Sequence, residues 1–448
     1  MHRYSGNTAA GQEEMLRSLG FGCMEELFAD IPEEARLKRP LDLPAPLAEQ
    51  DLIKKISALA AQNASLDEYT CFLGAGAYDR HIPSVIGHLV SRQEFLTAYT
   101  PYQPEISQGT LQSIFEYQSM ICELTGMDVA NASMYDGASA LAEAALCACA
   151  ASRRAKILIS AAVHPEYRKT VAAYCRFNSI EVEEIPFANG SVDLAFLAQK
   201  LDDAVGAVLL AQPNFFGIIE DVAAVSALTR KTKALLVVCA DPFALALLEA
   251  PGRLGADIVV GEGQALGNSM AFGGPHVGFF AAKEKYLRRM PGRIVGQTTD
   301  TEGKRGFVLT IQTREQHIRR QKATSNICSN QALCALTAAV YMTVMGKEGL
   351  REAARLSLAK ARYAYEKLLE TGRFAPLFPD APFFAEFALK AREPVEKLNQ
   401  RLLKEKIIGG FDLGREYTQL AGGWLVACTE KRSKEEIDFL AGKAGERA

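Results

Sequence analysis

The sequence contains no apolar run of eighteen residues, so it predicts no membrane-spanning helix. It lacks the GxxxxGK[ST] loop that cradles nucleotide phosphates, the GxSxG turn of serine hydrolases and the HExxH zinc motif. Its histidines are scattered, and Pro83 separates His81 from His88, which argues against a helical metal pair. The stretch Gly261–Gly267 places its last glycine one residue too late for a GxGxxG dinucleotide loop.

The net charge and the cysteines indicate what the protein does not bind and in which compartment it is found. The net charge of −3 gives no hint of nucleic-acid or membrane binding. None of the ten cysteines forms a CxxC pair, and most lie in apolar runs, as Cys239 does in LLVVCAD. The N-terminal stretch MHRYSGNTAAGQEE is polar and does not resemble a secretory signal. We therefore expect free, mostly buried thiols and a cytoplasmic protein.

The length of 448 residues predicts two or three domains with a large core. Residues 1–67 are expected to form helices and an extended arm, because AAGQEEMLRSLG has helical spacing and prolines at 40, 44 and 46 exclude helix. Residues 68–329 are expected to form a large α/β domain. A long helix from about Asn330 to Leu369 then leads into a small α+β domain, so the last segment is 330–448.

The middle of the chain alternates short apolar runs with helical patterns, which predicts a mostly parallel sheet with helices on both faces. The expected strands are 156–160, 181–186, 204–212, 234–241, 256–263 and 276–282. Asp241 ends one of these strands, at the edge of a parallel sheet where α/β proteins bind ligands. In pyridoxal enzymes an aspartate in this position protonates the ring nitrogen of the cofactor.

A pyridoxal enzyme places its Schiff-base lysine about one strand after that aspartate. No lysine occurs between Arg253 and Lys283, and Gln264-Ala265 stands where the amine is needed. The sequence therefore predicts no catalytic lysine and no covalently bound cofactor on this chain.

Three polar stretches are candidate sites. The stretch 99–105 holds Tyr99, Tyr102, Gln103 and Glu105 between prolines, and it suits either a small polar ligand or a rigid packed turn. At Asp136 and Ser139 a helix begins, which fits either an anion site or simple capping, and we expect caps. The third stretch, 313–328, could bind a carboxylate or an acidic partner, or form a solvated helix face; its candidate residues are Arg314, Arg319, Arg320 and Asn326.

Several long strings resemble the glycine cleavage system P-protein family. They are YTPYQPEISQGTLQSIFEYQSMICELTGMDVANASMYDGASALAEA, GEGQALGNSMAFGGPHVGFFAAK, PGRIVGQTTD and TREQHIRRQKATSNIC, in this order along the chain. The match is to the N-terminal half of the one-chain enzyme, which in some organisms is a separate subunit 1.

This resemblance implies the aspartate-aminotransferase class of pyridoxal-enzyme fold. It also implies a complex that decarboxylates glycine and passes the aminomethyl group to the lipoyl arm of the H-protein. Pyridoxal phosphate would be held by a partner, subunit 2, in an obligate-like heteromer, possibly two of each. Two other functions stay open: a structural pseudoenzyme that only keeps its partner folded, and an independent pyridoxal lyase or aminotransferase, which the missing lysine disfavours.

Overall fold

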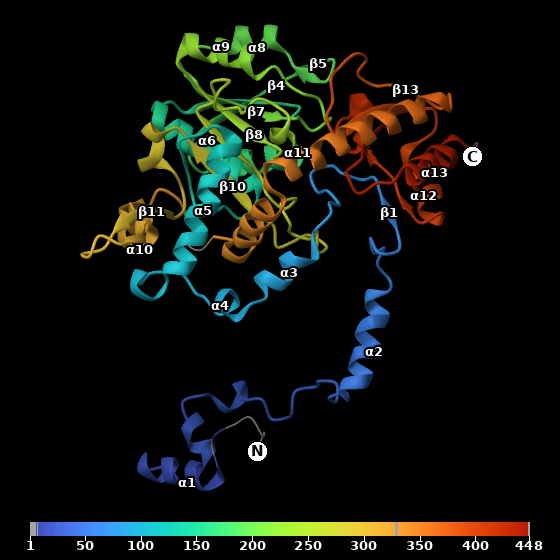
Figure 1. The fold of residues 1–448 in the computed structure, drawn as a ribbon. Coiled ribbons are helices and arrows are strands. Elements are labelled where there is room, and N and C mark those ends of the chain that lie inside the picture. The colour runs from blue at the N-terminus through green and yellow to red at the C-terminus, as the bar shows by residue number, and fades with distance from the viewer. Residues whose placement is uncertain (1–5, 7, 328–329, 447–448) are drawn as a thin grey trace. The chain divides into compact units, whose positions relative to one another are not determined.

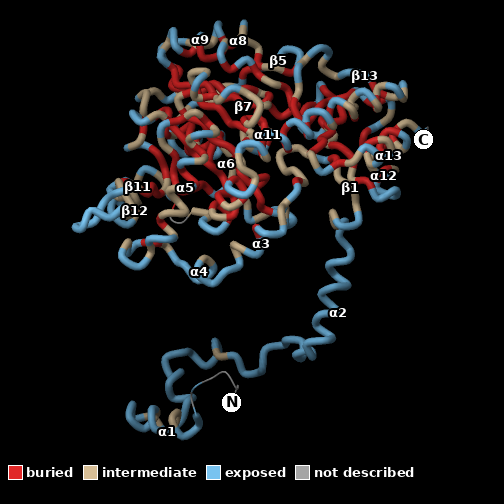
Figure 2. The backbone as a smooth tube through the Cα atoms, in the orientation of Figure 1, coloured by how far each residue is buried: buried red, intermediate tan, exposed pale blue. Residues whose placement is uncertain are grey.

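The structure, a computed structural model, describes residues 6, 8–327 and 330–446 and separates into two units, Met1–Ala64 and Ser65–Ala448. The first unit contains α1 (Ala9–Ser18) and α2 (Glu49–Ala60). Thr8 caps α1 by accepting a hydrogen bond from Gly11 N, and residues 40–47 lie outside any helix or strand, as their prolines predict. None of the described residues of this unit is buried (Figure 2).

The second unit is built around a seven-stranded sheet in the order β2-β10-β9-β8-β7-β3-β4 (Figure 1). Its strands are β2 (Val129–Ala130), β3 (Lys156–Ser160), β4 (Glu181–Ile185), β7 (Val205–Gln212), β8 (Leu235–Ala240), β9 (Ile258–Glu262) and β10 (Gly278–Ala282). The pairs from β4 to β9 are parallel, whereas β10 runs antiparallel to β9 and to β2. All six predicted strands are confirmed, each within its expected range.

Helices cover both faces of this sheet. The helices are α5 (Gln108–Thr125), α6 (Gly137–Ser152), α7 (Pro165–Arg176), α8 (Leu194–Lys200), α9 (Val222–Thr232) and α11 (Ala332–Glu370). On one face Leu209 and Val237 belong to a core with α6 and α7. On the other face Val208 and Val238 belong to a core with α5, α8, α9 and α11. The central strands β7, β8 and β9 are buried on both sides, which is why they read as continuous apolar runs, whereas the edge strand β4 is mostly not buried.

The long helix α11 leads into a small antiparallel sheet, as the sequence predicts. The sheet order is β13-β14-β17-β16, with β13 (Phe374–Pro376), β14 (Glu386–Ala391), β16 (Phe411–Asp412) and β17 (Gly423–Ala427). It packs against α11, α12 (Val395–Lys404) and α13 (Lys434–Gly445) around the buried Trp424. The small sheet and the large sheet belong to the same compact unit, so the expected boundary at 330 stays a prediction.

Shorter elements complete the unit. They are β1 (Thr70–Cys71), which pairs with β15 (Ile407–Ile408), the pair β5 (Phe187–Ala188) and β6 (Ser191–Val192), and the helices α3 (Ser84–Val90), α4 (Gln93–Leu96) and α10 (Gln316–Arg319). A hairpin of β11 (Ile294–Thr299) and β12 (Arg305–Thr310) was not expected from the sequence. Among the described residues, no helix combines the length and apolarity needed to cross a membrane.

A buried carboxylate ties the small sheet to the segment that precedes the large one. Glu386, the first residue of β14, accepts hydrogen bonds from Ala75 N at 2.6 Å and from the Tyr78 hydroxyl at 2.8 Å. A Cβ on Gly74, whose φ is +57°, would lie 2.3 Å from Glu386 Oε1, so the contact requires glycine there. Burial is the main cause that raises the pKa of Glu386 to about 7.

This raised pKa makes stability depend on pH. Between pH 4.5 and about 7 the folded chain holds the Glu386 proton more tightly than the unfolded chain, so the free energy of unfolding falls as pH rises through this window. Glu386→Gln keeps an acceptor for Ala75 N and a donor for the Tyr78 oxygen but cannot ionise. We expect the variant to gain stability relative to the parent chain above pH 7, by up to about 3 kcal/mol.

Urea unfolding of both proteins at pH 5 and pH 8 measures this difference. The exposed Glu396 on α12 provides the control, because Glu396→Gln should change stability little at either pH. A Glu386→Gln effect that is the same at both pH values would contradict the prediction.

Candidate functional site

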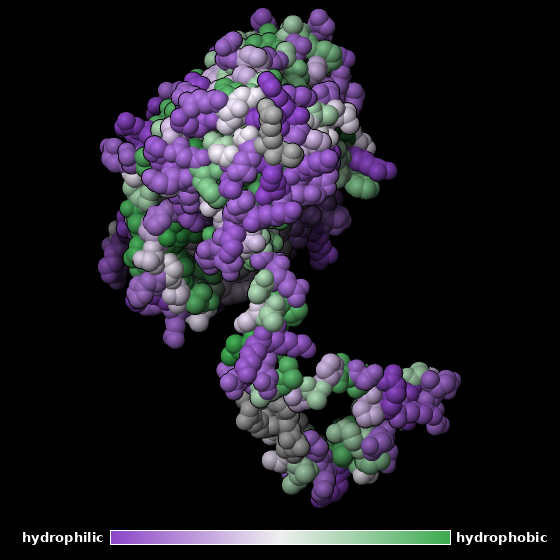
Figure 3. Space-filling model, turned by 90° about the vertical axis from the view of Figure 1, so that its right-hand side faces the viewer, coloured by the Kyte–Doolittle hydropathy of each residue, from purple (hydrophilic) through white to green (hydrophobic). Residues whose placement is uncertain are grey.

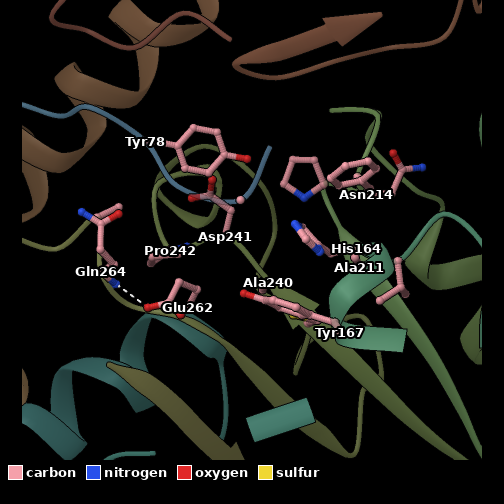
Figure 4. A pocket seen from close by; sticks show the side chains of 16 residues that line it. Tyr78, His164, Tyr167, Ala211, Asn214, Ala240, Asp241, Pro242, Glu262 and Gln264 are labelled. Atoms are coloured by element: carbon pink, nitrogen blue, oxygen red, sulfur yellow. Dashed lines mark hydrogen bonds between the residues drawn. The ribbon is translucent and has the colours of Figure 1, made fainter. Parts of the chain in front are cut away.

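A pocket of about 90 Å³ lies at the carboxyl ends of β7, β8 and β9 (Figure 4). Its walls include residues that lie one or two positions after these strands end: Asn214, Asp241 and Gln264. Parallel sheets bind ligands at this edge because the strand ends and their loops converge there. The fold therefore places Asp241 at the edge of the sheet where ligands bind, as the sequence predicts.

Asp241 is held by the turn after β8. Its Oδ1 accepts hydrogen bonds from Phe243 N at 2.7 Å and from Ala244 N at 3.3 Å. In Figure 4 the side chain points toward Tyr78, the residue that also donates to Glu386. The carboxylate thus faces the pocket with one oxygen already bound to its own backbone.

His164 was missed by the sequence analysis, and its position after β3 was the available signal. The backbone N–H of Glu166 donates to His164 Nδ1 at 3.1 Å, so Nε2 carries the proton and donates to Ala75 O at 3.0 Å. Burial lowers the pKa of His164, which keeps the ring neutral. The centre of its ring lies 4.9 Å from the centre of the Tyr167 ring, and both side chains line the pocket.

The residues present do not fit covalently bound pyridoxal phosphate. None of the described residues that line the pocket is a lysine, and Gln264 donates its side-chain amide to Asn268 O at 2.6 Å, away from the pocket centre (Figure 4).

Asp136 and Ser139 are caps, as expected. Asp136 Oδ1 accepts from Ser139 N at 2.7 Å, and the Ser139 hydroxyl reaches the Asp136 backbone, which forms a capping box at the start of α6. The cysteines match the prediction of free, mostly buried thiols, since the nine described cysteines are free and six of them are buried.

The stretch 99–105 lies on the surface, before α5. Tyr99 is 83% exposed and Tyr102 is 50% exposed, while Gln103 and Glu105 are exposed as well. Tyr99 borders a hollow of about 270 Å³ that is also lined by Arg293 and Asn330. The Tyr99 ring is therefore largely open to solvent.

Arg293 joins this loop to the charged stretch 313–328, although the two are about two hundred residues apart. Its guanidinium donates to the Tyr102 hydroxyl at 2.9 Å and lies 5.2 Å from the centre of the Tyr102 ring. It also lies 3.6 Å from the carboxylate of Glu315, and the Tyr102 ring packs edge-on against His317. Arg293 belongs to the string PGRIVGQTTD, and nothing in its local sequence predicts this contact.

The three predicted arginines separate in space. Arg314 is buried, and its guanidinium donates to the carbonyls of Met290, Gly292 and Ile311. Arg319, Arg320 and Asn326 are exposed. Arg314 is therefore fully engaged within the chain, whereas the other three side chains are available to another surface.

Arg319 also lines a basic groove of about 830 Å³. The other basic residues of the groove are Arg153, Arg154, Lys285, Arg288 and Arg289, and its acidic residue is Glu143. Burial raises the pKa of Glu143, whose carboxyl group accepts from the Ser325 hydroxyl. No ion pair forms at Arg153, Arg288, Arg289 or Arg319 within the part of the chain that the structure describes, so the groove can attract an anionic surface.

The second unit has the fold of pyridoxal-dependent enzymes. A glutamate decarboxylase of Lactobacillus brevis superimposes with a TM-score of 0.70 at 15% identity, over 93% of this chain and 96% of that one. A sphingosine-1-phosphate lyase of Burkholderia pseudomallei gives a TM-score of 0.67 at 16% identity, over 93% and 94%. At such low identity these likenesses show the fold alone, which confirms the expected fold class.

The chain belongs to the glycine cleavage system P-protein family, whose model matches residues 2–442. A probable glycine dehydrogenase (decarboxylating) subunit 1 of Carboxydothermus hydrogenoformans is 57% identical over 98% of both chains. The corresponding protein of Geobacillus kaustophilus is 52% identical over 100% of this chain and 99% of its own. A crystal structure of a glycine decarboxylase (P-protein) in inhibitor-bound form superimposes with a TM-score of 0.91 at 44% identity, over 99% of both chains.

The isolated chain should not retain pyridoxal phosphate. After incubation with pyridoxal phosphate and gel filtration, the isolated chain should carry far less than one equivalent of cofactor, because no pocket amine can form an imine. Visible absorbance of the protein peak measures what is retained. Stoichiometric retention with a new visible band would instead support the independent pyridoxal enzyme.

Proposed function

We propose that this chain is the non-cofactor-bearing subunit of a two-subunit glycine decarboxylase of the glycine cleavage system. The observation that carries the proposal is a chain that the P-protein family model matches over residues 2–442, and whose pocket keeps Asp241 but has no lysine among the described residues. With a second subunit, which would hold pyridoxal phosphate, it decarboxylates glycine. The complex then transfers the aminomethyl group to the lipoyl arm of the H-protein. Free thiols support a cytoplasmic setting.

In this proposal the exposed loop lines an active site shared with the second subunit. Tyr99, Tyr102, Gln103 and Glu105 are the candidate wall and orienting groups. The fixed Arg293–Tyr102 contact supports this role, because a substrate-orienting group must be held in place before the substrate binds. Arg319, Arg320 and Asn326 remain candidates for contact with the glycine carboxylate or the H-protein, whereas Arg314 would position the loop that carries them.

The N-terminal unit is our candidate for wrapping the second subunit. None of its described residues is buried, yet it exposes many large apolar side chains, which appear green in Figure 3. They include Met15, Leu19, Phe28, Leu41, Leu43, Leu52, Ile53, Ile56 and Leu59. An apolar surface of this extent is stable in water only when another surface covers it. The expected interface is large, on the order of 2,000 Å² or more.

The basic groove is our candidate for the H-protein contact. Its four arginines without ion pairs would meet acidic side chains of the carrier protein, and Arg319 connects the groove to the stretch 313–328. Such complementary charge mainly raises the association rate and makes it sensitive to salt.

A purely structural subunit remains the second candidate function. The buried, self-satisfied Arg314 and the capped α6 fit a scaffold as well as an enzyme. The exposed Tyr99 beside an open hollow favours the shared site, because a scaffold gains nothing from an exposed aromatic ring there.

The isolated chain should release no carbon dioxide from glycine when pyridoxal phosphate and lipoylated H-protein are supplied. Activity should appear only when the second subunit is added, because the reaction needs an amine-bound cofactor. Release of labelled carbon dioxide from carboxyl-labelled glycine measures this. Robust release by the chain alone would overturn the proposal.

Assembly should depend on the apolar face of α2. Leu52→Ala with Ile56→Ala should raise the dissociation constant of the heteromer by about 100-fold, because each side chain contributes roughly 1.5 kcal/mol or more when buried. Sedimentation or calorimetry of the mixed subunits measures the constant. The control is Lys55→Ala with Ser57→Ala in the same helix, and equal affinities of the two double variants would argue against the wrapping role.

Tyr99→Ala should lower the turnover of the assembled complex by about 10- to 100-fold, as expected for loss of an orienting wall. Phe177, which is 85% exposed, supplies the control, because Phe177→Ala removes a similarly exposed ring away from the loop. Both decarboxylation and aminomethyl transfer are measured after assembly is verified by sizing. If Tyr99→Ala and Tyr102→Ala both keep parental rates for both steps, the structural candidate takes the place of the shared site.

A further inference from the structure

The carboxylate of Glu262 accepts hydrogen bonds from several backbone N–H groups, as a bound anion would. Its Oε2 accepts a hydrogen bond from Gly137 N at 3.0 Å, and its Oε1 accepts from Gln264 N at 2.9 Å and from Val277 N at 3.4 Å. His276 Nδ1 lies 3.5 Å from Oε2, and this contact is the main cause that raises the pKa of His276. Three backbone N–H groups from separate segments and one imidazole thus converge on one carboxylate.

One of these N–H groups belongs to the first residue of α6, a helix of sixteen residues. The N-terminus of a helix carries a partial positive charge and free N–H groups, and phosphate groups commonly bind there. In this chain the Glu262 carboxylate accepts a hydrogen bond from the N–H of Gly137, and the carboxylate of the capping residue Asp136 accepts one from the N–H of Ser139. Two carboxylates therefore already compensate the positive end of the helix.

The space over this helix end is also filled. A Cβ placed on Gly137 would lie 2.5 Å from the Tyr167 hydroxyl and 3.0 Å from Glu262 Cβ. The remaining cavity of about 90 Å³ lies beside these side chains and is bordered by Asp241 and His164 (Figure 4). A phosphate group that approached α6 would displace Glu262 or share its N–H donors with a second negative charge.

We propose that Glu262 is an internal ligand of a phosphate-type anion site at the N-terminus of α6, and that it excludes phosphate and phosphate-bearing cofactors from this pocket. The exclusion is independent of the missing lysine. A chain without the Glu262 carboxylate should accept inorganic phosphate, and should bind pyridoxal phosphate non-covalently better than pyridoxal, which lacks the phosphate group.

The test uses the full chain without its partner and three probes: inorganic phosphate, pyridoxal phosphate and pyridoxal. Glu262→Ala removes both charge and bulk, Glu262→Gln removes charge alone, and Glu262→Asp keeps the charge. Calorimetric titration should show that Glu262→Ala binds phosphate and pyridoxal phosphate at least about tenfold more tightly than the parent chain, with no such gain for pyridoxal. Glu262→Asp should behave as the parent, and Glu262→Gln should show a smaller gain.

Glu220 provides the matched control. It is a buried carboxylate that accepts from the backbone N–H of Val192 at 3.1 Å, and it does not line the pocket. Glu220→Ala should lose stability in a similar way but should gain no phosphate affinity. Circular dichroism and sizing establish which variants are folded. If Glu262→Ala does not fold, the comparison is made with Glu262→Gln.

Two results would overturn the proposal. One is a parent chain that binds phosphate and pyridoxal phosphate as tightly as the Glu262 variants do. The other is a folded Glu262→Ala or Glu262→Gln chain with no gain for either phosphate probe. Neither result bears on the activity of the assembled complex, so a failure here is distinguishable from a failure of the proposed function.

Discussion

The packing of the α6 N-terminus against the end of β9 is the contact on which the pocket depends. Gly137 and Glu262 lie 125 positions apart, and the backbone N–H of one meets the carboxylate of the other. The close approach requires glycine at 137, because a side chain would collide with Tyr167 and with β9. This contact holds the start of α6 against the end of β9, beside the cavity of about 90 Å³.

The pocket keeps two polar side chains at the carboxyl edge of the sheet, and none of its described lining residues is a lysine. Asp241 and His164 keep positions that face the pocket, but the former is bound by its own turn and the latter is neutral and fixed to Ala75 O. In the proposed complex, this chain would support its partner through its outer surface. That surface carries the loop 99–105, the open hollow beside Tyr99 and the basic groove.

Arg293 shows how one buried charge organises an exposed surface. Its side chain is 7% exposed, and it holds the Tyr102 hydroxyl on one side and the Glu315 carboxylate on the other. Because a buried guanidinium is costly without partners, the contacts with Tyr102 and Glu315 stabilise the position of Arg293. The N-terminal unit follows the opposite rule: it has no buried residue among those described, so its apolar side chains gain stability only from another surface.

The sequence by itself determined the elements whose signal is local. Continuous apolar runs such as Val205–Gln212 located the strands, prolines at 40, 44 and 46 located the arm, and Asp136 and Ser139 marked the start of α6. The missing lysine was also readable, and the long P-protein strings indicated the family. Only the tertiary structure decided the burial of Arg314, the link through Arg293 and the contact of Glu262 with Gly137. Local propensity and hydrophobic period report on neighbours within a few residues, whereas these contacts join segments that come together only when the sheet and its helices pack.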